Sequence, residues 1–137
     1  MIKAFLDTSY AIALAASTDQ FHQRAIQLAN HLESDKTQII TTQAILLEIG
    51  NALSKQRYRQ AAVVLLESLT CDLTVEIVPI SEALYQSGFR LFRERPDKEW
   101  GLVDCLSCIV MQENGISEAL TSDEHFRQMG FRPLLRD

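Results

Sequence analysis

Short runs of apolar and β-branched residues recur along the chain, separated by longer segments in which apolar residues return every three or four positions. Runs of this length, bounded by polar or turn-forming residues, are typical of strands buried in a sheet. They predict four buried strands and a further strand at an edge of the sheet. The predicted strands are Ile2–Leu6, Thr37–Thr42, Leu73–Val78, Glu118–Thr121 and Phe131–Leu135.

The intervening segments have the apolar spacing of helices that turn one face toward a core. Ser81 and Asp123 are typical residues for the start of a helix, and Pro96 and Gly115 stand where helices end. The predicted helices are Tyr10–Ala16, a segment that opens at Thr18-Asp19, Gln43–Arg57, Arg59–Cys71, the segment from Ser81 to Arg95, Leu102–Asn114 and Asp123–Met129. This alternation predicts a three-layer α/β/α fold with a central, mostly parallel sheet.

Length and composition narrow the class of protein. A chain of 137 residues fits one domain, residues 1–137, that can bury a full core. Three cysteines are too few, and odd in number, for a disulfide scaffold, so a reducing, cytoplasmic location is expected. No apolar run reaches the length of a membrane span, and no membrane attachment is expected.

Four acidic residues stand at positions where solubility does not require them. Asp7 and Asp123 each follow a predicted strand, at the edge of a parallel sheet where ligands bind. Asp104 interrupts a helix otherwise suited to burial, where an unpaired carboxylate costs several kcal/mol. Glu48 flanks the apolar face of another helix, one turn from the small residue Ala52. These four side chains are the candidates for a functional site.

Each acid taken alone also has an ordinary structural explanation. Asp7 and Asp123 could cap helices, Glu48 could be a solvated helix residue, and Asp104 could be a satisfied polar group in the core. The functional interpretation therefore depends on the four together. Clustered carboxylates repel one another, and a hard divalent cation such as Mg²⁺ or Mn²⁺ offsets that repulsion. Such a site can hydrolyse phosphodiester bonds.

The segments around these acids resemble those of PIN-domain ribonucleases, most of all the VapC-type toxins of bacterial toxin–antitoxin pairs. The resemblance covers nearly the whole chain, and its C-terminal third is the most specific part. The matching segments are Phe5-Leu6-Asp7-Thr8-Ser9, Leu46–Leu53, Asp97–Ser107, Ala119–Phe126 and Met129-Gly130-Phe131.

The resemblance implies an endoribonuclease that hydrolyses RNA with one or two Mg²⁺ or Mn²⁺ ions and is neutralised by a small antitoxin protein. The implied catalytic and metal-binding residues are Asp7, Glu48, Asp104 and Asp123. The hydroxyls of Ser9 and Thr121 match positions that orient these carboxylates, although helix capping explains them equally well. A homodimer is expected, with apolar surface from the helices around Ile45–Leu53 and Val63–Leu69.

Other features are interpreted as structural. Cys105 and Cys108 lack the second pair that a zinc site needs, so packing is favoured. For His125 a solvated helix position is favoured over contact with RNA. For Trp100 packing in the core or at the start of a helix is favoured over stacking on a base.

The acidic balance of the chain bears on its affinity for RNA. The net charge is −5, from 18 acidic and 13 basic residues, so affinity for bare RNA should be modest and the metal important. Arg90 and Arg93 share a helix face that could contact phosphates, or could simply be solvated.

Two other classes of protein remain as alternatives. A non-catalytic binding module of the same fold would use the groove to capture a protein or RNA partner, and the complete set of acids disfavours it. A receiver-type signalling domain needs an aspartate at the end of a middle strand, where Thr42 and Pro79 stand instead.

Overall fold

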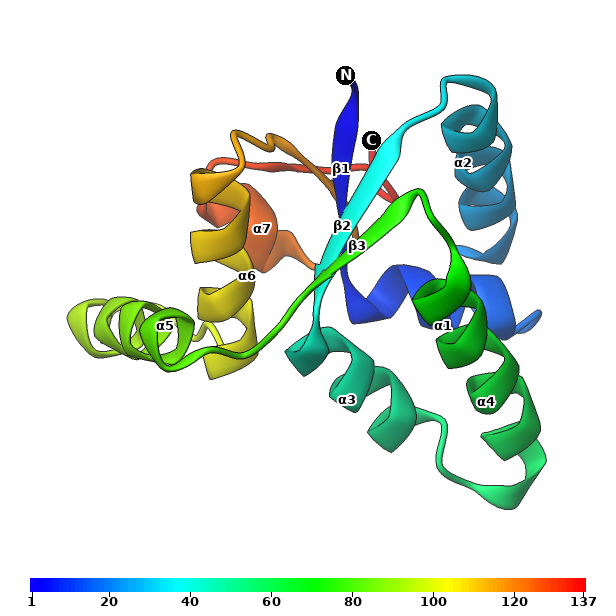
Figure 1. The fold of residues 1–137 in the computed structure, drawn as a ribbon, viewed down its shortest axis with the longest axis horizontal. Helices are drawn as coiled ribbons and strands as arrows, with labels where there is room; N and C mark the ends of the chain where they lie inside the picture. The colour runs from blue at the N-terminus through cyan, green and yellow to red at the C-terminus, as the bar shows by residue number, and fades with distance from the viewer.

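The computed structural model describes all residues, 1–137, and has a five-stranded parallel sheet at its centre (Figure 1). The order of the strands across the sheet is β3-β2-β1-β4-β5, and every neighbouring pair is parallel. The strands are β1 (Lys3–Leu6), β2 (Gln38–Thr42), β3 (Val75–Val78), β4 (Glu118–Leu120) and β5 (Arg132–Pro133). The predicted parallel sheet and its edge strand near the C-terminus are confirmed.

Helices cover both faces of the sheet, as the three-layer prediction requires. In Figure 1 α1, α2 and α4 lie on one side of the strands, α5, α6 and α7 lie on the other, and α3 lies at the lower end. The helices are α1 (Thr8–Ala15), α2 (His22–Ser34), α3 (Gln43–Ala52), α4 (Gln56–Cys71), α5 (Glu82–Glu94), α6 (Leu102–Glu113) and α7 (Glu124–Gln128). None of these helices is both long and apolar enough to cross a membrane.

The core is continuous through all three layers. Phe5 and Ile40 pair across β1 and β2, and both are fully buried. Leu120 of β4 pairs with Leu6 on the other side of β1, while Met111 of α6 is also fully buried. Burying each large apolar side chain stabilises the fold by ~1.5–3 kcal/mol. The central strands are therefore held rigidly, and so are the residues at their ends.

The pairing of β1 with β4 positions the candidate site. Phe5 lies opposite Ala119 and Leu6 opposite Leu120, so the carboxyl ends of both strands meet at the same edge. The amide N–H of Asp7 continues this ladder and donates to the carbonyl of Leu120 at 3.2 Å. Residues that are more than a hundred positions apart in the sequence thus become neighbours.

The predicted helix Gln43–Arg57 is wrong at its end, because the chain turns between Ala52 and Gln56. Leu53 closes α3 by donating its N–H to the carbonyl of Ile49, and α4 starts at Gln56 rather than Arg59. The guanidinium of Arg59 donates to the carbonyl of Ser54 at 2.7 Å and holds the turn. Neither glycine nor proline occurs in this turn. The helical spacing of apolar residues therefore gave no sign that the helix ends there.

Two predicted starts also move, in each case because an aspartate makes a tight turn. The carboxylate of Asp19 accepts from the N–H of Phe21 at 2.8 Å, and α2 begins only at His22. Asp72 accepts in the same way from Thr74 at 2.8 Å, so β3 begins at Val75. Both turns are ones in which an Asp side chain bonds the backbone two residues on.

The helix faces predicted to supply a dimer surface lie partly in the core. Ile45 and Ile49 of α3 are fully buried within this chain. On the outside of the same two helices, Leu47, Val63 and Val64 remain exposed. An apolar contact with a second copy through these two helices would use these three side chains instead.

Candidate active site

Four elements bring the four predicted acids to the carboxyl edge of the sheet. Asp7 follows β1 directly, Glu48 is on α3, Asp104 is in the first turn of α6, and Asp123 is the N-cap of α7. Asp7 is buried, with 6% of its surface exposed. The carboxylates of Asp104 and Glu48 lie near enough to raise the pKa of Asp7 by repulsion.

A cluster of hydroxyls holds the carboxylate of Asp7. Thr121 donates its hydroxyl to Asp7 Oδ2 at 2.6 Å, and Ser9 donates to the same oxygen at 3.3 Å. The two hydroxyl oxygens are 3.0 Å apart. Ser9 also accepts from the N–H of Ser122, and Thr121 accepts from that of Asp123, each at 3.0 Å. The cluster therefore joins the end of β1 to the end of β4.

Asp7 stands at the N-cap position of α1, yet its side chain makes no capping hydrogen bond. The capping explanation is therefore wrong for Asp7. It is correct for Asp123, whose Oδ1 accepts from the N–H of His125 at 2.8 Å. Capping and a role in the site do not exclude each other for Asp123, because its second carboxylate oxygen is not used by the cap.

The environment of Asp7 disfavours its charged form. Burial raises its pKa from the ordinary 3.8 to about 6. The hydrogen bond from Thr121 opposes this rise, and the charges of Asp104 and Glu48 add to it. None of the ion pairs in the molecule involves Asp7. A buried acid without a cationic partner is what an absent metal ion would leave behind.

Glu48 is oriented by a residue that the sequence did not single out. The hydroxyl of Thr8 donates to Glu48 Oε1 at 2.6 Å, which joins α1 to α3. Thr8 lies between Asp7 and Ser9, two candidate site residues. Its hydroxyl group in that position is the feature that could have indicated a role in the site. The sequence could not show that its partner is 40 positions away.

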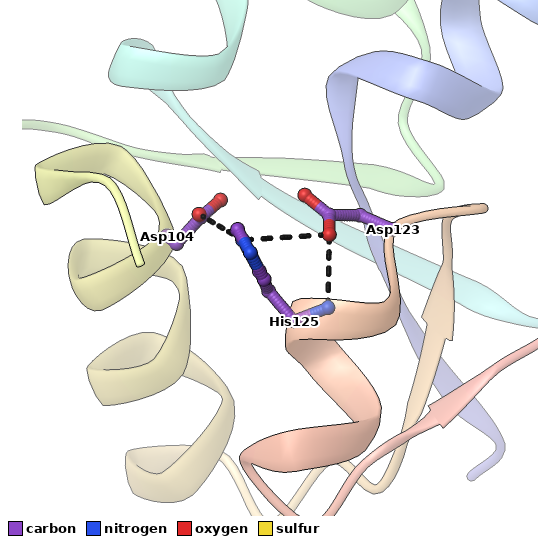
Figure 2. A group of neighbouring side chains, drawn as sticks. All are labelled: Asp104, Asp123 and His125. Atoms are coloured by element: carbon purple, nitrogen blue, oxygen red, sulfur yellow. Dashed lines mark hydrogen bonds and ion pairs between the residues drawn. The ribbon is translucent and has the colours of Figure 1, made fainter. Parts of the chain in front are cut away.

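The third part of the site is a close group of two carboxylates and an imidazole (Figure 2). Nδ1 of His125 lies 3.2 Å from Asp104 Oδ2 and 3.5 Å from Asp123 Oδ1. The N–H of Gly101 also donates to Asp104 Oδ2, at 3.0 Å. One potential ligand atom from each of the three side chains lies within 4.8 Å of the other two.

The interpretation of His125 as a solvated helix residue is wrong. Figure 2 shows its ring on α7 turned toward α6, between the two carboxylates. Its side chain is 31% exposed. The first turns of α6 and α7 lie side by side, and that packing supplies the partner, Asp104, which local sequence could not indicate.

The structural interpretations of the neighbouring residues are confirmed. Cys105 and Cys108 are buried in α6, and burial raises the pKa of both thiols, that of Cys105 to about 11. Trp100 is also buried, and its indole N–H donates to Gln128 Oε1 at 2.9 Å. The guanidinium of Arg95 covers the ring, 5.1 Å from its centroid. These residues support α6 and α7 rather than line the site.

The donor set fits a hard divalent cation. Carboxylate oxygens are the ligands that Mg²⁺ and Mn²⁺ prefer, and four carboxylates gathered at one edge need a counter-charge. Asp7 is buried with hydrogen bonds from two hydroxyls and no cationic partner, which agrees with that need. The residues present therefore fit such an ion.

Comparison with known proteins relates the chain to one family. The profile of the PIN domain matches residues 4–132. A similar solved structure is that of VapC20 from Mycobacterium tuberculosis, a toxin that cleaves the sarcin-ricin loop. It is 25% identical, with a TM-score of 0.81 over 93% of this chain and 95% of that one.

The fold is also shared with VapBC2 from Rickettsia felis, solved bound to a DNA fragment from its promoter. That chain is 17% identical, with a TM-score of 0.65 over 97% of both chains. Comparison with curated protein sequences gives no significant match. Because the family profile spans nearly the whole sequence, this chain belongs to the PIN-domain family.

Proposed function

We propose that this protein is an endoribonuclease that hydrolyses RNA phosphodiester bonds with Mg²⁺ or Mn²⁺ and acts as the toxin of a type II toxin–antitoxin pair. The observation that carries the proposal is the meeting of Asp7, Glu48, Asp104 and Asp123 at one edge of the sheet in a PIN domain. The similarity to VapC20 supports RNA as the class of substrate and a toxin as the role.

In this proposal the four carboxylates would hold one or two divalent ions. A bound ion would supply charge neutralisation at the phosphoryl oxygens and lower the pKa of a water molecule. Thr121 and Ser9 hold Asp7 in place, and Thr8 does the same for Glu48. These hydrogen bonds fix the carboxylates before substrate arrives, so little reorganisation is needed during the reaction.

Cleavage of a labelled mixture of cellular RNAs tests the proposal. Purified protein with Mn²⁺ or Mg²⁺ should cleave RNA, and EDTA or Asp7→Asn should reduce the rate by at least ~10²-fold, as loss of a key electrostatic group does. Asp35→Asn is the matched control, because Asp35 is exposed at the end of α2 and should leave the rate unchanged.

Two outcomes would contradict the proposal. Cleavage that survives in Asp7→Asn would point to a contaminating nuclease or to a different site. Failure of the wild-type protein to bind Mn²⁺ in calorimetry would favour a binding module with a PIN fold.

The toxin role needs its own test in living cells. Induced expression of the wild-type protein in a bacterial host should arrest growth, whereas Asp7→Asn should not, because the proposed role depends on cleavage. Normal growth with wild-type protein that is active in vitro would separate the nuclease from the toxin role.

An apolar groove offers a place for the antitoxin. A cavity of about 610 Å³ lies between α1, α2 and α4, lined by apolar side chains that include Leu14, Leu32 and Leu65. It adjoins a second apolar hollow that Val64 borders. We infer that an apolar segment of the antitoxin lies there. Ala61→Glu, at the edge of that second hollow, should therefore abolish rescue of growth by a co-expressed antitoxin while leaving cleavage of RNA intact.

A further inference from the structure

We propose that His125 is a metal ligand, a nitrogen donor that completes the site with Asp104 and Asp123 and shifts its preference from Mg²⁺ toward Mn²⁺ and Co²⁺. This inference rests on the proposed metal-dependent function and adds to it a residue and a selectivity. The carboxylates alone predicted a site made only of oxygen ligands.

The separations of the three donor atoms fit ligands around one ion. Six-coordinate ions with bonds of ~2.1 Å place neighbouring ligand atoms ~3 Å apart and opposite ones ~4.2 Å apart. Nδ1 of His125 is 3.2 Å from Asp104 Oδ2 and 3.5 Å from Asp123 Oδ1, the range for neighbouring ligands. All three donors are within 4.8 Å of one another, so small adjustments would bring them around a common centre.

Backbone contacts hold these donors in place. The N–H of His125 donates to Asp123 Oδ1, so the cap of α7 fixes the imidazole relative to that carboxylate. The N–H of Gly101 fixes Asp104 in the same way at the start of α6. Figure 2 shows the imidazole edge with Nδ1 turned toward both carboxylates. A donor held in this way loses little freedom when it binds an ion.

The type of donor determines the selectivity. Mg²⁺ strongly prefers oxygen ligands, whereas imidazole nitrogen suits the later first-row ions, whose affinities rise from Mn²⁺ to Co²⁺. A site with one nitrogen among carboxylates should therefore discriminate against Mg²⁺ more than a site of carboxylates alone. Mn²⁺ tolerates both kinds of ligand and should bind well.

Calorimetric titration with MgCl₂, MnCl₂ and CoCl₂ tests the inference on the full chain. His125→Ala should weaken binding of Co²⁺ by about 10- to 100-fold, the scale for loss of a group that supports a metal site. Binding of Mg²⁺ should change by less than about threefold, because its preferred oxygen ligands remain. His31→Ala is the control, since His31 is exposed on α2, far from the site in sequence.

A second variant distinguishes loss of the nitrogen donor from loss of side-chain volume. His125→Gln keeps a polar side chain and offers an oxygen, so it should lower affinity for Co²⁺ while retaining that for Mg²⁺. Pulsed electron paramagnetic resonance of bound Mn²⁺ gives a direct readout: the wild type should show coupling to a histidine nitrogen, and His125→Ala should not.

The outcomes distinguish this inference from the function on which it rests. Mn²⁺ that binds without nitrogen coupling, or equal losses for Mg²⁺ and Co²⁺ in His125→Ala, would overturn the role of His125 and leave the carboxylate site standing. Wild-type protein that binds none of the three ions would overturn both.

Discussion

At the scale of the residue, Asp7 opposes stability and serves the proposed function. The pKa of its carboxyl rises from 3.8 to about 6 on folding, because burial disfavours the charge. Because the folded protein binds the proton of Asp7 more tightly than the unfolded chain does, folding is most favourable below pH 3.8, where the carboxyl is mostly neutral in both states. This advantage is lost as the pH rises through 6. At 1.36 kcal/mol per pH unit, the charged form costs ~3 kcal/mol at neutral pH. The metal-free protein is therefore destabilised by its own acid.

Asp7→Asn should stabilise the protein in EDTA. We expect the free energy of unfolding at pH 8 to rise by ~1–3 kcal/mol, and most of the gain to be gone at pH 4, where Asp7 is protonated in the folded state and about half protonated in the unfolded state. Urea unfolding at the two pH values measures this. Asp35→Asn should show no such pH-dependent gain. A variant that is less stable than wild type at pH 8 would contradict the prediction.

Thr121 is the second residue with a measurable effect. It is fully buried, and its hydroxyl both donates to Asp7 and accepts from the N–H of Asp123. Thr121→Val should cost ~1–3 kcal/mol of stability, since it leaves buried polar groups unpaired, and should weaken binding of Mn²⁺. Thr121→Ser keeps the hydroxyl and should recover most of both. Urea unfolding measures the stability of both variants, and calorimetry measures their affinity for Mn²⁺. An unchanged affinity for Mn²⁺ in Thr121→Val would show that Thr121 does not position the metal site.

The limits of sequence reasoning also appear at this scale. Asp7 and Asp123 could be predicted because acids after short apolar strands are visible in the sequence, and the carboxyl ends of parallel strands share an edge. The hydrogen bond between Thr8 and Glu48 and the contact of His125 with Asp104 could not be predicted from the sequence. They join residues 40 and 21 positions apart and depend on how the helices pack.

At the scale of the element, the types of helix and strand followed from periodicity, but their boundaries and neighbours did not. The turn at Ser54 contains no glycine or proline that would mark it in the sequence. It is held instead by Arg59, whose guanidinium donates to the carbonyl of Ser54. The order of strands, with β4 inserted beside β1, is set by long-range pairing and has no local signal. Yet this order is what brings Thr121 and Asp123 to Asp7.

The packing of α5 against α6 gives a prediction at this scale. A Cβ added at Gly88 would overlap the side chain of Leu106, with Cγ only 3.2 Å away. Gly88→Ala gains helix propensity of ~1 kcal/mol, but overpacking costs typically ~1–3 kcal/mol, so we expect a net loss of stability. Gly50→Ala is the control, because its nearest contact is an ordinary 3.9 Å, and it should be neutral or stabilising. Thermal unfolding of both variants measures the change in stability. A Gly88→Ala variant that is more stable than the wild type would contradict the close packing of α5 against α6.

At the scale of the whole molecule, exposed apolar side chains favour self-association. Leu47 is 63% exposed on α3, and Val63 is 41% exposed on the adjoining α4. Sedimentation should therefore find a homodimer, and Leu47→Asp should weaken it by at least about tenfold, because a charge at an apolar contact is costly. Glu113→Gln, an exposed change on α6 away from these helices, should leave the dimer unchanged. A wild-type monomer at micromolar concentration would contradict the prediction.

The pairing of β1 with β4 also has a consequence for synthesis of the protein. Asp7, Glu48 and Asp104 are made first, and the strand that holds Thr121 and Asp123 against Asp7 is made after all three of them. A growing chain therefore has no complete site until β4 and α7 have left the ribosome. An enzyme that degrades RNA would therefore stay inactive while most of the message for this domain is being translated.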